Sequence, residues 1–94
     1  MRAAKRDDNH AEIRDNLRAI GAMVHDTGSM GGGFPDLVVG YRGVIYLLEV
    51  KDGNKPPSKR RLTPDEQKFF NDWAGYPVHV VNSIEEAIDA ITNE

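Results

Sequence analysis

Two apolar runs, residues 37–41 and 44–50, constrain the fold of this 94-residue chain more than any other feature. Both are rich in β-branched and aliphatic residues, and only Arg42 and Gly43 separate them, so they predict two antiparallel strands joined by a tight turn. Their nearly continuous apolar character predicts a sheet that is covered on both faces. Charged residues at the outer ends of such strands cost free energy unless something pairs them.

Those outer ends carry Asp36, which precedes the first run, and Glu49-Val50-Lys51, which closes the second. Asp36 and Glu49 each lie six residues outside the turn, so antiparallel pairing sets them opposite each other. Because alternate strand residues share a face, Lys51 points the same way as Glu49, and Val50 faces the other layer. The pattern therefore predicts two carboxylates and a lysine in one cluster.

Two neighbouring carboxylates repel each other, and a divalent cation is the simplest way to neutralise them. Mg²⁺ is the natural candidate, because proteins usually hold it with one or two carboxylates, waters and phosphate oxygens. Such a cation can polarise a phosphodiester and activate water. Lys51, which is cationic at its ordinary pKa, can stabilise the negative charge that builds up during the reaction. These groups together are typical of a phosphodiester hydrolase.

The rest of the chain predicts three helices and two further strands: helices at about 8–20, 63–74 and from 83 onward, and strands at 22–26 and 76–81. Asp8 or Asn9 can cap the first helix. The later two begin at Thr63 and Ser83, each followed three residues later by the glutamate of a capping box. The order αβββαβα predicts a single α/β (α+β) domain over residues 1–94, with a central mixed sheet flanked by helices.

The composition limits which cellular compartment and which partners the protein can have. Cysteine is absent, which fits a reducing cytoplasm, and no apolar run approaches the ~20 residues of a membrane span. The net charge of −3 argues weakly against nucleic acid, but residues 51–61 hold five basic residues and one acid. We therefore expect a cytoplasmic protein with no membrane partner and a flexible basic loop at about 52–62. This loop would contact phosphates through Lys55, Lys59, Arg60 and Arg61.

The pattern of motifs resembles a known nuclease family. Glu49-Val50-Lys51 begins thirteen positions after Asp36, as in the PD-(D/E)xK signature. The fuller pattern resembles a small stand-alone VRR-NUC domain of the viral type over nearly the whole chain: Gly33-Phe34-Pro35-Asp36-Leu37, Glu49-Val50-Lys51, Leu62-Thr63-Pro64-Asp65-Glu66-Gln67 and Val78-His79-Val80-Val81. The resemblance implies a restriction-endonuclease-like core.

The resemblance also implies roles for particular residues. Asp36, Glu49 and the Val50 carbonyl would ligate Mg²⁺ or Mn²⁺, and Lys51 would be the catalytic lysine. Gln67 and Glu12 would be further catalytic residues that approach from flanking helices. Proteins of this group act as homodimeric endonucleases on branched DNA, including four-way (Holliday) junctions. A phage origin, and hence the cytoplasm of a bacterial host, follows from the same resemblance.

Some of these features also allow other interpretations. The chain can also be a non-catalytic DNA-binding module on a nuclease fold, but the intact cluster around Glu49 argues against this. The glycine-rich loop at 27–33 is not followed by Gly-Lys-Ser/Thr, so no nucleotide cofactor is expected. We expect its backbone to approach the metal or the DNA, with Ser29 in contact. Phe69, Phe70 and Trp73 predict part of the core or a dimer face.

Overall fold

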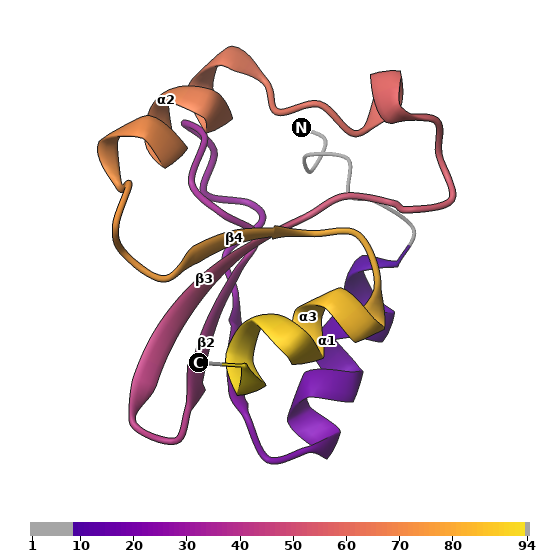
Figure 1. Ribbon diagram of the computed structural model, residues 1–94, viewed down its shortest axis with the longest axis vertical. Helices are drawn as coiled ribbons and strands as arrows, with labels where there is room; N and C mark the ends of the chain where they lie inside the picture. Colours follow the sequence, from indigo (N-terminus) through magenta and orange to yellow (C-terminus); the bar gives the residue numbers. More distant parts are fainter. Residues whose placement is uncertain (1–8, 94) are drawn as a thin grey trace.

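The computed structural model describes residues 9–93. The elements run in the order α1 (His10–Ala19), β1 (Met23–Asp26), β2 (Leu37–Tyr41), β3 (Val44–Val50), the 3₁₀ turn η1 (Pro57–Lys59), α2 (Pro64–Asp72), β4 (Val78–Val81) and α3 (Ile84–Thr92) (Figure 1). Apart from the short η1 turn, this is the predicted αβββαβα order. No helix within residues 9–93 is long and apolar enough to span a membrane.

The four strands form one mixed sheet in the order β1-β2-β3-β4. Strands β1 to β3 are antiparallel neighbours, and β4 returns through α2 to lie parallel to β3. Positive φ angles at Arg42 (49°) and Gly43 (82°) form the tight turn between β2 and β3. The pairing of Leu37 with Leu48 confirms the predicted register, which puts Asp36 opposite Glu49.

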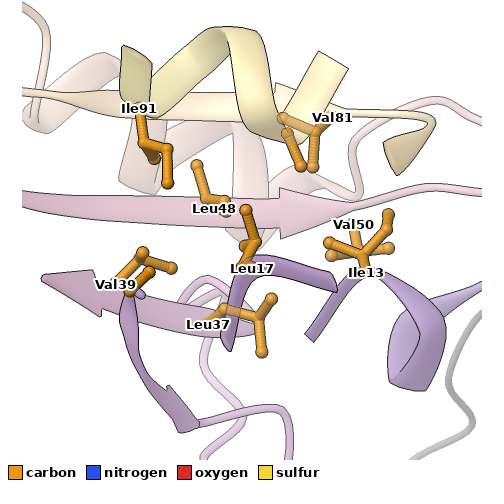
Figure 2. Close-up of a cluster of buried hydrophobic side chains, with 10 residues drawn as sticks. Ile13, Leu17, Leu37, Val39, Leu48, Val50, Val81 and Ile91 are labelled. Atoms are coloured by element: carbon orange, nitrogen blue, oxygen red, sulfur yellow. The ribbon is translucent and has the colours of Figure 1, made fainter. Parts of the chain in front are cut away.

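Helices α1 and α3 pack side by side on one face of the sheet and enclose the core (Figure 1). Figure 2 shows the residues that fill this space: Ile13, Leu17, Leu37, Val39, Leu48, Val50, Val81 and Ile91. Because strand side chains alternate, the burial of Leu48 and Val50 here sends Glu49 and Lys51 to the opposite face.

That opposite face is covered only in part, so the prediction of a sheet covered on both faces is wrong. Helix α2 is nine residues long, all of them described, and none of them is buried. Beside α2 lies an apolar hollow of about 380 Å³, and Ile45 and Tyr76 at its edge are both 66% exposed. The runs are apolar on this face because their side chains line the hollow.

The aromatic residues at the end of α2 form a half-exposed layer, so they are not part of the core, and the alternative of a dimer face stays a prediction. Phe34 packs edge-on against Phe69 with ring centroids 5.3 Å apart, and Phe69 stacks on Trp73 at 5.1 Å. Trp73 is 40% exposed and contacts Tyr76. These rings attach α2 to the segment that leads into β2.

The helix starts follow the predicted caps in part. Thr63 and Glu66 form a complete capping box at α2. At α3, Ser83 accepts from the Glu86 N–H, but the Glu86 side chain accepts from the Asn82 N–H instead of the Ser83 N–H, so the second box is only half formed.

The start of α1 departs further from the expected cap. Asn9 occupies the N-cap position, but its side chain makes no capping bond. Its amide donates to the carbonyls of Lys51 (3.1 Å) and Asn82 (3.2 Å), which ties α1 to the ends of β3 and β4. Asp8, the other candidate cap, lies outside the described residues.

Candidate active site

Asp36 is fixed at the start of β2 by the backbone on both sides of it. The Thr27 hydroxyl donates to the carbonyl of the buried Pro35 (2.7 Å), and the Thr27 N–H donates to the Asp36 carbonyl (2.8 Å). The Asp36 Oδ2 atom accepts from the Val50 N–H at 2.8 Å. The carboxylate is therefore held against the end of β3, where Glu49 and Lys51 are located.

Glu49 and Lys51 share the face that looks toward α2, as predicted. Glu49 is 3% exposed and Lys51 is 9% exposed. The Lys51 Nζ atom lies 3.6 Å from Glu49 Oε2. The other oxygen, Glu49 Oε1, is buried and has no hydrogen-bond partner among the described residues. One carboxylate oxygen at the centre of the cluster thus lacks any donor from residues 9–93.

Burial and neighbouring negative charge make Glu49 hard to ionise. Burial, followed by the charges of Asp36 and Glu66, raises the pKa of Glu49 from its ordinary 4.5 to about 9. Burial also raises the pKa of Asp36, although the Val50 N–H opposes this shift. Without a cation, Glu49 therefore keeps its proton at neutral pH.

Glu66, the third carboxylate of the cluster, comes from α2. Its Oε1 atom lies 2.9 Å from Lys51 Nζ and also accepts from the Thr63 N–H at 2.9 Å. Burial alone would raise the pKa of Glu66, but the hydrogen bonds from Lys51 and Thr63 outweigh burial and lower the pKa. From the sequence, Glu66 was assigned only a capping role. The capping box could have indicated the contact with Lys51, because it turns the Glu66 side chain back toward the loop that connects Lys51 to α2.

The chemistry of these groups suits a divalent cation. When ionised, the three carboxylates and the Lys51 ammonium leave two negative charges in one cluster, which a divalent cation balances. Within residues 9–93 no group of three or more His, Asp or Glu side chains is arranged to hold a metal. The available donors are Asp36 and Glu49, together with the Val50 carbonyl, and two carboxylates are the usual protein contribution to a Mg²⁺ site.

Gln67 and Glu12 are not brought into this cluster. Gln67 is exposed, and its amide donates to Asn71 Oδ1 at 3.0 Å. Neighbouring helix residues point about 100° apart, so the inward direction of Glu66 turns Gln67 away. Glu12 is exposed on α1, which packs on the other face of the sheet. It lines a polar hollow of about 380 Å³ together with Arg60. Their catalytic roles stay predictions.

The basic loop connects the end of β3 to α2 and contains the η1 turn. Lys59 and Arg61 are exposed, whereas Lys55 and Arg60 are half-buried. The Arg60 Nε atom is buried and has no hydrogen-bond partner within the part of the chain that the structure describes. The loop therefore presents some of its cations to solvent and turns others toward the protein.

The backbone of the glycine-rich loop lies close to the start of α2. The sequence had instead predicted a close approach to the metal or the DNA. A Cβ atom at Gly33 would overlap the Asp65 carbonyl, and the φ of Gly33 is +84°. Ser29 is exposed near the tip of this loop. Gly33 thus lets the first turn of α2 lie directly on the segment that leads to Asp36.

His10 is a buried polar residue that the sequence interpretation left without a role. It is 3% exposed, and its Nε2 atom lies 3.8 Å from Asp26 Oδ1. The spacing of His10 from Ile13 and Leu17 puts it on the buried stripe of α1. This spacing could have predicted from the sequence that His10 is buried.

Comparison with known proteins adds one match. No protein-family model matches the chain, and no curated protein matches it. Among solved structures, one described as a VRR_NUC domain matches with a TM-score of 0.67 and 28% sequence identity, over 96% of this chain and 98% of the other. Over nearly its whole length the chain is similar, in fold and in sequence, to a VRR-NUC domain, and this supports the resemblance that the motifs predicted. The match supports a nuclease domain with a restriction-endonuclease-like fold, as the sequence motifs predicted.

Proposed function

We propose that this VRR-NUC domain is a Mg²⁺- or Mn²⁺-dependent DNA endonuclease that hydrolyses phosphodiester bonds. The observation that carries the proposal is the meeting of Asp36 and Glu49 beside Lys51 on one face of the sheet. One buried and one half-buried carboxylate so close together are unfavourable unless a cation or a proton compensates them. The raised pKa of Glu49 expresses this cost in the metal-free protein.

Each residue of the cluster has an assignable role. Asp36, Glu49 and the Val50 carbonyl would hold the cation, and the Val50 N–H fixes the orientation of Asp36. When bound, a divalent cation polarises a phosphoryl oxygen and lowers the pKa of water. The Lys51 ammonium would face the phosphate and stabilise the negative charge that grows on its oxygens during in-line attack.

A cleavage assay tests this function. The substrates are linear, flap and four-way junction DNA, each with Mg²⁺, with Mn²⁺ and with EDTA. We expect Glu49→Gln and Lys51→Ala to lose cleavage while retaining the circular dichroism spectrum of the wild type. Full activity in EDTA would contradict the metal-dependent mechanism. Tight DNA binding without cleavage under every condition would instead favour a non-catalytic DNA-binding module.

We further propose that the basic loop binds the DNA backbone. Lys59 and Arg61 are exposed in the loop that leaves directly from Lys51, so phosphates near the site lie within their reach. Each phosphate contact contributes about 0.9 to the slope of log affinity against log salt concentration. Replacing both residues with glutamine should therefore reduce this slope, and an unchanged slope would contradict the assignment.

We also propose a homodimer that acts on branched DNA in the cytoplasm. Residues 9–93 of each chain contain one cluster that combines Asp36, Glu49 and Lys51, so two chains would be needed to cut two strands of a four-way junction together. Light scattering should give the mass of a dimer, and cleavage of both strands should depend more steeply on protein concentration than the nicking of one. A monomer that resolves junctions with first-order dependence on protein would contradict this proposal.

A further inference from the structure

The Lys51 ammonium lies between the carboxyl groups of Glu66 and Glu49, and the closer of the two, Glu66, does not belong to the Asp36–Glu49 pair. Glu66 Oε1 lies 2.9 Å from Lys51 Nζ, whereas Glu49 Oε2 lies at 3.6 Å. The side chains are well enclosed, with exposures of 11% for Lys51 and 17% for Glu66. An ion pair with this much burial and hydrogen-bond geometry orients its partners far more strongly than a surface pair does.

Glu66 makes this contact with an oxygen that is itself fixed. The same Oε1 atom accepts from the Thr63 N–H at 2.9 Å, and the Glu66 N–H donates to the Thr63 hydroxyl at 3.2 Å. The reciprocal capping box therefore leaves the Glu66 side chain little freedom. Lys51 is held by an acceptor whose position is set by the start of a helix.

The start of α2 is in turn fixed against the segment that carries Asp36. Gly33 permits the Asp65 carbonyl to lie where a side chain would otherwise be, and the neighbouring Phe34 packs on Phe69. The acceptor for Lys51 and the carboxylate of Asp36 are thus connected through one short stretch of chain. This connection fixes the position of the lysine relative to the carboxylate pair.

We propose that Glu66 is a positioning residue, which holds the Lys51 ammonium toward the reacting phosphate by a contact that does not depend on Glu49. The inference rests on the proposed nuclease function. Glu49 is a ligand candidate, so its oxygens are not available to orient Lys51 once they are engaged elsewhere. Glu66 provides a separate acceptor, and the lysine stays in place when Glu49 changes partner.

The chain contains a matched control for a purely structural role. Glu86 occupies the same position in α3 as Glu66 does in α2, and it accepts from the Asn82 N–H and side-chain amide. A variant at Glu86 should weaken a helix start without touching Lys51. Comparison of the two positions separates loss of a cap from loss of the lysine contact.

The experiment measures kcat and KM for Glu66→Gln, Glu66→Ala and Glu86→Ala on the best-cleaved DNA. The second readout is the ¹⁵N NMR signal of the Lys51 ammonium in EDTA. We expect Glu66→Gln, which can still accept from Thr63, to lower kcat on the order of 10-fold, and Glu66→Ala on the order of 100-fold, with little change in KM. The sharp ammonium signal of the wild type should broaden in both variants, whereas Glu86→Ala should leave kcat and the signal unchanged.

Wild-type kcat in Glu66→Ala, or an equal loss in Glu86→Ala, would overturn the inference. A wild type that cleaves no DNA would refute the proposed function, and the NMR readout would remain decisive for the contact. In that case an ammonium signal that responds to Glu66 supports the contact, and one that does not respond overturns it.

Discussion

Helices α2 and α3 begin with the same kind of capping sequence but have different roles in the structure. Each is nine residues long and starts at a hydroxyl residue whose side chain accepts from the backbone N–H three residues later. Helix α3 buries Ala87 and Ile91 in the core, whereas α2, described in full, buries no residue. The glutamate of α3 reaches Asn82, and that of α2 reaches Lys51. The comparison teaches that a capping motif fixes where a helix starts, and that its surroundings decide what its glutamate does.

The difference follows from what each helix packs against. The α3 helix lies on the core face of the sheet, where an apolar stripe is the best surface to present. The α2 helix follows the loop that leaves Lys51, and its first turn lies over the charged end of the other face. We therefore expect changes in α3 to affect stability and changes at the start of α2 to affect the site.

The largest expected effect sharpens this contrast through core packing. Ile91→Ala in α3 removes a side chain that is 3% exposed, and should lower the free energy of unfolding by about 2–5 kcal/mol. Phe69→Ala in α2 removes a side chain that is only half-buried, so less apolar area returns to water and the loss of stability should be smaller. Urea denaturation of both variants measures the difference. Equal losses would break the distinction between a core helix and a site helix.

The next effect concerns pH. Folding raises the pKa of Glu49 from 4.5 to about 9. At a pH between these two values, Glu49 is protonated in the folded protein and ionised in the unfolded chain. Unfolding then releases a proton, so the metal-free protein should lose stability as pH rises through this window. Denaturation in EDTA at several pH values measures this slope.

Matched variants assign that slope to the charged end of the sheet. Glu49→Gln removes the titrating group and should flatten the dependence, whereas Glu86→Gln at the start of α3 should leave it in place. A slope that survives in Glu49→Gln would mean that another group carries it.

The smallest expected effect tests how α2 is attached. Gly33 and Gly75 both have positive φ angles, 84° and 95°, but only at Gly33 would a Cβ atom meet other atoms. Alanine at either position incurs left-handed strain of about 1–2 kcal/mol, and at Gly33 it also collides with the Asp65 carbonyl. Gly33→Ala should therefore be less stable than Gly75→Ala and should cleave DNA more slowly. Equal stability and rates would argue against the close approach.

The sequence by itself determined the strands that carry the site and their register. Arg42 and Gly43 fix a two-residue turn, and the period of two along a strand then pairs Asp36 with Glu49 and puts Lys51 on the same face. This could be counted because turn length and alternation are local properties. The family resemblance followed from the same residues, and the match to a VRR-NUC domain bears it out.

Only the tertiary structure decided which neighbours complete that site. Periodicity gives the stripe of a helix but not the face of the sheet on which it packs, so Glu12 was expected at a site that lies across the sheet from α1. The capping box predicted where α2 begins, but the contact of Glu66 with Lys51 depends on Gly33 and Phe34, which are distant in sequence. Such contacts arise from the packing of whole elements, and no local pattern contains that information.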